Sequence, residues 1–154
     1  SSDQSIVLKD ETLLAFPSPG HTADDVCFSG SGFIITGDTL FNGTVGNCFS
    51  GDLEAFYHSL KRLMDFPAET QIYSGHDYVA QSMVEARMIE PENPEIDAFL
   101  ARYSPDRVVS TLADEFKVNP YLRFNSPEII ETLKQRGLYQ DSALGRFKTL
   151  MEVY

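Results

Sequence analysis

The chain contains three polar side chains that each follow a glycine at the end of an apolar segment: His21, Asp38 and His76. Because strand ends at one edge of a sheet carry the sites of α/β proteins, we expect these side chains to converge. Two imidazoles and one carboxylate form a ligand set that suits Zn(II), Fe(II) or Mn(II). A carboxylate has two oxygens, so Asp38 could bridge two ions that together activate a water molecule. These residues therefore predict part of a dinuclear metal site.

Each of the three residues also has a purely structural interpretation. His21 could hydrogen-bond a turn, Asp38 could form an Asx-turn, and His76 could be an ordinary surface or core histidine. The metal interpretation is favoured because all three occupy the same position relative to a glycine and a predicted strand. Either Asp24 or Asp25 could then orient His21 by accepting a hydrogen bond from its second ring nitrogen.

The composition restricts the partners of the protein. The formal net charge of the 154 residues is -11, and the isoelectric point is near 4.5. Nucleic acids and anionic membranes attract clustered Lys and Arg, and the sequence has no basic run, so we expect neither partner. No apolar stretch reaches the length of a membrane span.

The two cysteines, Cys27 and Cys48, are too few for a disulfide framework. We interpret both as buried, unpaired residues in a reducing compartment, which predicts a cytoplasmic protein. A nucleophilic role for Cys48 has no support, because no histidine lies near it in the sequence.

Residues 1–90 have the pattern of an α/β domain. We expect strands at 6–8, 13–16, 26–28, 33–36 and 71–74 and helices at 53–64 and 79–88. The run Phe33–Ile35 is continuously apolar, which is typical of a strand covered on both faces. Asp52 is a candidate N-cap of the first helix. His58 lies on the polar face of that helix, so we expect it to be exposed to solvent.

Residues 91–154 have the pattern of a helical C-terminal extension. After Pro91 we expect only helices, at 94–103, 110–116, 127–136 and 141–153. The residues that could cap the starts of these helices are Asn93, Ser110, Ser126 and Asp141. Gly137 is a candidate for the left-handed residue that ends a helix.

Three motifs in the first part resemble a known family. Pro-Gly-His-Thr (19–22), Gly-Asp-Thr-Leu-Phe (37–41) and Gly-His-Asp-Tyr (75–78) are similar, in order and spacing, to signatures of the metallo-β-lactamase superfamily. They fit its glyoxalase II (hydroxyacylglutathione hydrolase) branch, whose helical C-terminal part the segments 110–116 and 119–123 also resemble. The resemblance implies an α/β fold, the second half of an αββα sandwich followed by a helical C-terminal extension.

The resemblance also implies an activity and a set of roles. His21 would bind one metal ion, Asp38 would bridge both, and His76 would bind the second. Tyr78 matches a tyrosine that contacts the substrate, and Asn47 stands nearest to a lysine that binds glutathione. The expected cofactor is a pair of divalent ions, zinc first and iron or manganese as alternatives. The expected reaction is hydroxide attack on a thioester, or an ester, at this dinuclear site.

Two features depart from the family pattern. The leading Thr-His-x-His-x-Asp-His motif is absent, so we expect these residues to form the C-terminal portion of a longer enzyme and to be inactive alone. The loop 42–51 and the tail 149–154 contain no Lys or Arg, although glyoxalase II binds anionic glutathione with basic residues in these regions. A thioester or related ester is therefore a firmer expectation than a glutathione thioester.

Two other functions stay open from the sequence. One is a persulfide dioxygenase-like enzyme, in which His21 and Asp38 serve a single Fe(II) and His76 is not needed. The other is a degenerate, non-catalytic module whose helical extension serves interaction. The helical extension counts against the dioxygenase, and the acidity of the chain counts against a nuclease.

Overall fold

The computed structural model describes residues 3–154, which contain a mixed six-stranded sheet with the order β1-β2-β3-β4-β7-β8. Neighbouring strands are antiparallel except β4 and β7, which run parallel. The strands of this sheet are β1 (Gln4–Leu8), β2 (Glu11–Pro17), β3 (Val26–Gly30), β4 (Phe33–Gly37), β7 (Gln71–Ser74) and β8 (Ser110–Thr111). A separate two-stranded ribbon, β5 (Leu40–Phe41) with β6 (Thr44–Val45), follows β4. The predicted α/β fold is confirmed.

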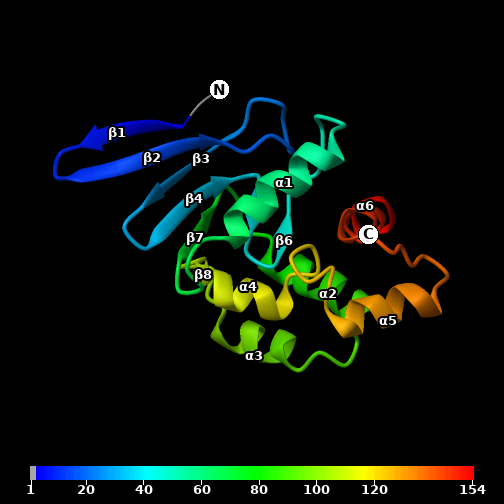
Figure 1. The fold of residues 1–154 in the computed structure, drawn as a ribbon. Helices are drawn as coiled ribbons and strands as arrows, with labels where there is room; N and C mark the ends of the chain where they lie inside the picture. The colour runs from blue at the N-terminus through cyan, green and yellow to red at the C-terminus, as the bar shows by residue number, and fades with distance from the viewer. Residues whose placement is uncertain (1–2) are drawn as a thin grey trace.

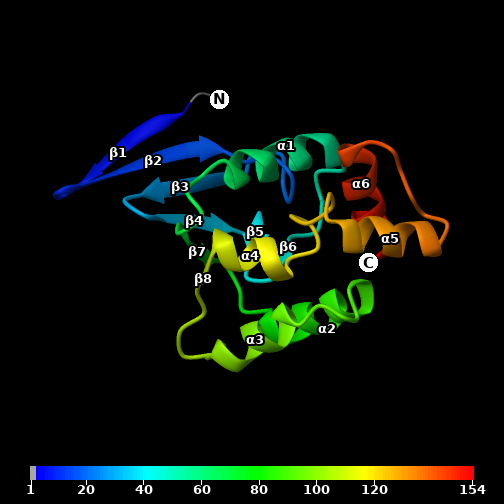
Figure 2. The same ribbon diagram turned by 60° about the horizontal axis from the view of Figure 1, so that its bottom comes forward.

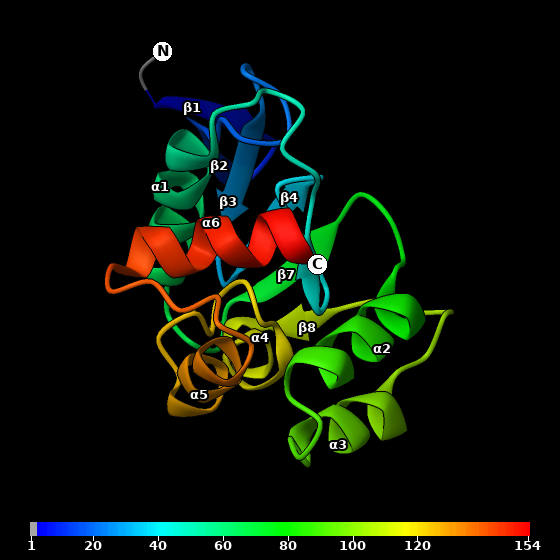
Figure 3. The ribbon, with the colours of Figure 1, turned by 90° about the vertical axis from the view of Figure 1, so that its right-hand side faces the viewer.

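Helices α1 (Leu53–Met64) and α6 (Ala143–Val153) pack together on one side of the sheet (Figures 1 and 3). The Phe56 ring of α1 meets the Phe147 ring of α6 edge-on, with centroids 6.1 Å apart, and both side chains are fully buried. Asp52 is the N-cap of α1, as predicted, because its carboxylate accepts a hydrogen bond from the Ala55 amide. The predicted exposure of His58 is also confirmed.

The other face of the sheet is open within residues 3–154. Successive side chains of a strand point to opposite faces of the sheet, so the exposure of neighbouring residues in β4 shows whether each face is covered. Ile34 is fully buried, whereas Ile35 is 42% exposed and Tyr73 of β7 is 38% exposed. The prediction that the run Phe33–Ile35 is covered on both faces is therefore wrong for the described chain, which covers one face only.

Residues after Pro91 are mostly helical, as predicted. The first of these helices, α3 (Glu95–Arg102), packs against the preceding helix α2 (Val79–Ile89) through an apolar cluster that includes Met83 and Phe99, and the two lie together at one end of the molecule (Figure 2). α5 (Pro127–Gln135) and α6 complete this part of the chain. Within the described residues, no helix combines the length and the apolarity that crossing a bilayer requires.

The expected helix at 110–116 begins later than predicted. Ser110 and Thr111 form β8, which pairs with Ile72 and Gln71 of β7, and α4 runs over Leu112–Val118. Thr111 rather than Ser110 is the cap, because its hydroxyl accepts the Asp114 amide while the Asp114 carboxylate accepts the Thr111 amide. The expectation of helices alone after residue 91 is therefore corrected by one short strand.

The remaining predicted caps have mixed outcomes. Ser126 caps α5 as predicted, and Gly137 follows that helix with a left-handed φ of 70°. Ser142 instead of Asp141 caps α6, because the Ser142 hydroxyl accepts the Gly145 amide. Pro94 precedes α3, although the predicted Asn93 still accepts the Glu95 amide with its side chain.

Candidate metal centre

Strand direction brings the three predicted ligands to one edge of the sheet. β2 and β4 are each antiparallel to β3, and β4 is parallel to β7, so β2, β4 and β7 all point the same way. His21 lies in the loop after β2, Asp38 directly follows β4, and His76 follows β7. The carboxyl ends of these strands therefore deliver the three side chains to a common place, as expected for an α/β site.

The Asp38 carboxylate lies between the two histidines. Its Oδ2 is 3.6 Å from His21 Nε2, and its Oδ1 is 3.6 Å from His76 Nε2. Two ligands of one tetrahedral zinc ion are separated by roughly 3.3–3.6 Å when each bond is about 2.0–2.2 Å long. Each histidine is thus paired with a different carboxylate oxygen at a separation that a shared ion accommodates. The predicted convergence of the three side chains is confirmed.

Within residues 3–154, no three His, Cys, Asp or Glu side chains surround one point closely enough to hold a single ion. This finding agrees with the two separate His–Asp38 pairs, because each pair supplies only two donors toward any one ion. A carboxylate that faces two imidazoles through two oxygens has the form of a bridge between two ions. The donor set fits divalent metal, and each ion would need further ligands from outside these three residues.

A backbone carbonyl fixes the orientation of His21. His21 Nδ1 lies 2.9 Å from the Asn47 carbonyl oxygen, which can only accept, so the Nδ1–H donates. A neutral His21 ring therefore presents the Nε2 lone pair to Asp38 Oδ2. Two lone pairs facing each other repel unless a proton or a cation lies between them, so the geometry suits a cation. A second ring hydrogen bond of this kind is common for metal-binding histidines.

The prediction that Asp24 or Asp25 orients His21 is wrong. The Asp25 carboxylate instead accepts from the Thr22 amide at 2.9 Å and from the Thr22 hydroxyl at 2.5 Å. Asp24 lies 3.2 Å from the same hydroxyl. These bonds close the turn after His21, so the two carboxylates shape the loop while the Asn47 carbonyl holds the imidazole.

Glycines make room for the close approach of these loops. A Cβ on Gly75 would lie 2.4 Å from Asp38 Oδ1, and a Cβ on Gly46 would lie 1.9 Å from the Asp38 carbonyl oxygen. Gly37 has a left-handed φ of 52°, which allows the chain to turn directly from β4 into Asp38. The Gly75 amide also donates to the Gly37 carbonyl at 2.8 Å. Each glycine that precedes a predicted ligand thus has a physical reason: a Cβ would lie 2.2 Å from the Phe56 ring at Gly20 and 2.4 Å from Asp38 at Gly75, and Gly37 adopts a left-handed φ.

Comparison with known families adds to this geometry. Residues 1–76 match the model of the metallo-β-lactamase superfamily, and residues 77–152 match the model described as hydroxyacylglutathione hydrolase C-terminus. The chain belongs to the metallo-β-lactamase superfamily, in its glyoxalase II-like branch. Membership implies that divalent metal is bound.

Individual relatives agree with this placement. The glyoxalase II-like chain is 36% identical over 136 residues to hydroxyacylglutathione hydrolase of Pseudoalteromonas translucida, covering 84% of this chain and 53% of that protein. It is 34% identical over 134 residues to the hydroxyacylglutathione hydrolase of Vibrio cholerae, covering 83% of this chain and 53% of that protein. The chain therefore spans about half the length of the curated relatives it matches.

A solved structure supports the fold. The crystal structure of ETHE1 from Myxococcus xanthus superposes with a TM-score of 0.60 at 23% identity, over 97% of this chain and 59% of that one. The expected superfamily fold, with a helical C-terminal region, is thereby confirmed for the glyoxalase II-like chain.

A buried network connects the helical part to the loops of the glyoxalase II-like site. The Glu115 carboxylate of α4 is fully buried and accepts from the Gly43 amide at 2.9 Å, the Asn119 side chain at 2.8 Å and the Ser110 hydroxyl at 2.6 Å. Burial raises the pKa of Glu115 to about 7, although these three hydrogen bonds oppose the shift. The carboxylate thus holds the segment that leads from Asp38 toward Asn47.

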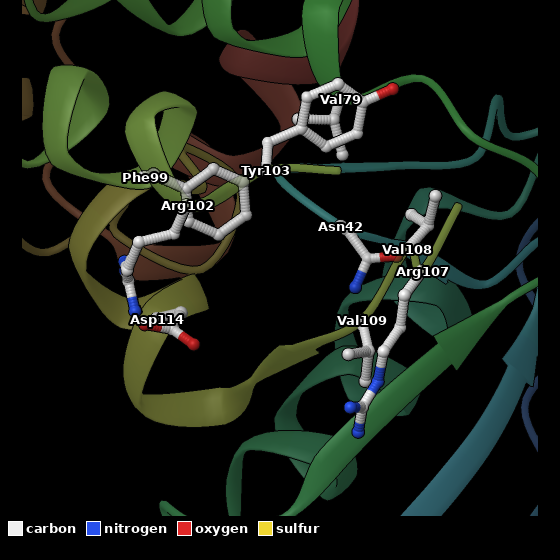
Figure 4. A pocket seen from close by; sticks show the side chains of 9 residues that line it. All are labelled: Asn42, Val79, Phe99, Arg102, Tyr103, Arg107, Val108, Val109 and Asp114. Atoms are coloured by element: carbon white, nitrogen blue, oxygen red, sulfur yellow. Dashed lines mark hydrogen bonds and ion pairs between the residues drawn. The ribbon is translucent and has the colours of Figure 1, made fainter. Parts of the chain in front are cut away.

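The same network reaches the loop of His76. The Asn42 side chain is buried, donates to Ser110 Oγ at 2.6 Å, and presents Oδ1 to Ser74 Oγ at 2.9 Å. Ser74 Oγ is also 3.0 Å from the His76 carbonyl oxygen. Asn42 lines a cavity of about 50 Å³ with Tyr103, Arg102 and Asp114 (Figure 4). This space suits water and is too small for a substrate.

A larger cavity, of about 320 Å³, lies beside the candidate metal centre and is lined by both predicted substrate-binding residues, Tyr78 and Asn47. Tyr78 is 47% exposed, and its ring is 5.5 Å from the ring of His76. Gly46, adjacent to the carbonyl that holds His21, lines the same cavity. Its size is at the lower end of the range for small-molecule sites.

Replacing Gly75 with alanine should weaken metal binding in the protein at its natural length. The new Cβ would push Asp38 Oδ1 away from its place opposite His76, so we expect about a tenfold loss of zinc affinity, as for other losses of ligand orientation. Competition with a chelating dye measures the affinity. Gly32→Ala is the control, because Gly32 has a strained φ of 79° but open space around it. Equal zinc affinity in wild type and Gly75→Ala would contradict the steric argument.

Proposed function

We propose that this chain supplies three ligands of a dinuclear metal site, His21, Asp38 and His76, to a hydrolase that cleaves small thioesters or related esters. The observation that carries the proposal is the placement of Asp38, whose two oxygens each lie 3.6 Å from a different histidine. A single-iron enzyme of the persulfide dioxygenase type has no need of the second pair, His76 with Asp38. The hydrolase is therefore the better explanation of the geometry.

Two bound divalent ions would supply an activated water and polarise the carbonyl under attack. In thioester hydrolysis a C–O bond forms, the C–S bond breaks, and the products are a carboxylic acid and a thiol. The residues of this chain position the reaction. The Asn47 carbonyl keeps His21 Nε2 directed at Asp38, and the exposed Tyr78 ring borders the cavity in which the substrate would lie.

The proposal includes a limit on the activity of residues 1–154 alone. Three ligands are too few for two tetrahedral ions, so the isolated chain should bind zinc weakly and should not hydrolyse thioesters. Zinc is the expected metal, with iron or manganese as alternatives. A cytoplasmic location fits the two free thiols of Cys27, which is buried, and Cys48, which is partly buried.

Metal analysis of the protein at its natural length tests the proposed function. We expect two divalent ions per chain and thioester cleavage without consumption of oxygen, because both oxygens of Asp38 would be occupied. One iron per chain with oxygen uptake would contradict the hydrolase and favour the dioxygenase. No bound metal at all would favour a non-catalytic module. Tight binding of two zinc ions by residues 1–154 alone, measured by equilibrium dialysis, would contradict the expected weakness of the isolated chain.

A further inference from the structure

The two histidines of the candidate metal centre are held in different ways. The His21 ring donates from Nδ1 to the Asn47 carbonyl at 2.9 Å, the His21 carbonyl accepts from the Ser50 amide at 3.2 Å, and the side chain is 19% exposed. The His76 side chain is 55% exposed, and within residues 3–154 its Nδ1 forms no hydrogen bond of this kind. The direction of the His76 ring therefore depends on where its backbone is held.

Ser74 holds the backbone of His76. Its hydroxyl is within hydrogen-bond distance of two acceptors, the His76 carbonyl at 3.0 Å and Asn42 Oδ1 at 2.9 Å. A hydroxyl has one proton to donate, so the two acceptors share it. Asn42 lies in the turn between β5 and β6, on the segment that follows Asp38. Ser74 thus connects the loop of one predicted metal ligand to the segment that follows another.

The Asn42 side chain has a defined orientation, because the groups around its amide nitrogen fix it. Nδ2 donates to the Ile72 carbonyl at 3.3 Å, which can only accept, and to Ser110 Oγ at 2.6 Å. Since Ser110 Oγ accepts this bond, its own proton is directed to Glu115 Oε1, which lies 2.6 Å away. The side chains of Ser74, Asn42, Ser110 and Glu115 therefore form one hydrogen-bond series, in which every donor points toward the carboxylate and the bonds strengthen one another. Its last three members are buried.

The series requires a carboxylate at its end. Glu115 Oε1 accepts from Ser110, while Oε2 accepts from the Gly43 amide at 2.9 Å and from Asn119 Nδ2 at 2.8 Å. A glutamine has one acceptor oxygen. If that oxygen kept the bonds of Gly43 and Asn119, the NH2 group would face the Ser110 hydroxyl. Ser110 would then receive donors from both sides, and the Asn42 amide would have to turn over.

We infer that Glu115 is a positioning residue for His76, on which it acts through the series. The inference rests on the proposed dinuclear site and deepens it, because it assigns control of one of the two ions to α4, which carries none of the three predicted ligands. Loss of the series should release the loop of His76 and weaken the ion bound there. The ion of His21 should be little affected, because the Asn47 carbonyl and the Ser50 amide, which hold that residue, lie outside the series.

Amide hydrogen exchange in the metal-free protein at its natural length tests the inference independently of activity. The hydrogen-bonded Gly75 amide reports on the loop of His76, and the Ser50 amide, which donates to His21, reports on the other ligand loop. Ser110→Ala removes the central hydroxyl of the series and should speed exchange at Gly75 by about fivefold, the effect of one lost hydrogen bond. Exchange at Ser50 should stay unchanged. Unchanged exchange at Gly75, or equal acceleration at both amides, would overturn the inference.

The two zinc affinities of the same protein, measured by competition with a chelating dye, test the effect on metal. His76→Ala identifies the ion bound at that ligand as the one whose affinity falls. Glu115→Gln should weaken the same ion by about tenfold, as for other losses of ligand orientation, and leave the other ion within about twofold. Glu11→Gln, the same change on an exposed side chain at the start of β2, should alter neither. Unchanged affinities in Glu115→Gln, or equal weakening of both ions, would contradict the assigned role.

A double variant separates positioning through the series from a general effect of Glu115 on the fold. Ser74→Ala cuts the series next to His76, so Glu115→Gln added to Ser74→Ala should weaken that ion no further. Additive losses would refute the inference, because Glu115 would then act by another route. If the wild type binds no metal, the proposed function fails, and the exchange rates at Gly75 and Ser50 still decide whether the series holds the loop.

Discussion

Replacing Asp38 with alanine is expected to reduce thioesterase kcat/KM by at least about a thousand-fold in the protein at its natural length. The physical reason is that one carboxylate faces both histidines, so in the proposed dinuclear site its removal would take a ligand from both ions at once. Bound metal should fall from two ions per chain to one or none. Steady-state kinetics and metal analysis on the same preparation measure both effects.

The control for this variant is Asp10→Ala, which removes an exposed carboxylate in the turn between β1 and β2. It should retain both activity and metal. A second variant, Asp38→Asn, keeps the size of the side chain and should still lose activity, because a neutral amide is a poor bridge between cations. Retention of more than a tenth of the activity in Asp38→Ala would refute the assignment of the bridging ligand.

The stability of the chain is expected to decrease as the pH rises from about 4.5 to 7, through the ionisation of Glu115. The pKa of this carboxyl is raised from 4.5 to about 7 by burial, so the folded state binds its proton more tightly than the unfolded state. Protonation therefore favours folding, and that contribution is lost as the pH passes through this window. The loss is on the order of 3 kcal/mol at about 1.4 kcal/mol per pKa unit. Urea unfolding at a series of pH values measures it.

Glu115→Gln isolates this effect from other titrating groups. The variant cannot ionise, so the difference in unfolding free energy between wild type and variant should change across the same pH window. The glutamine side chain also loses hydrogen bonds. It has one acceptor oxygen in place of two, and its NH2 group cannot accept from the donors of Gly43, Ser110 and Asn119. That loss is independent of pH. A constant difference from pH 4.5 to 7 would show that Glu115 does not titrate there.

Much of the candidate site could be predicted from local sequence patterns. Each predicted ligand closes an apolar strand, and strand direction in an α/β sheet is constrained enough to place such residues at one edge. This is why the convergence of His21, Asp38 and His76 was foreseeable without knowledge of the strand order. The helix at Asp52 was also foreseeable, since a side chain three residues from the amide it caps is a local feature.

Features that depend on contacts between distant residues could not be predicted. The partner of His21 is the Asn47 carbonyl, and every residue has a carbonyl, so no side-chain type marks it. Glu115 lies in a segment with an ordinary helical pattern, and only the folded chain shows that its carboxylate is buried and accepts from Gly43, Ser110 and Asn119. β8 could not be predicted, because a strand of two residues is too short to show an alternating pattern.

The pairing of β8 with β7 has a consequence for how the molecule comes apart. Beyond the strand pairing itself, the Leu112 amide donates to the Thr70 carbonyl at 3.0 Å and the Ala113 amide to the Ala68 carbonyl at 2.7 Å. These bonds connect the start of α4 to the residues just before β7. Melting of either region strips backbone partners from the other. We therefore expect the regions matched by the two family models to unfold together, so that proteolysis would not remove the helices after residue 91 and leave an intact sheet.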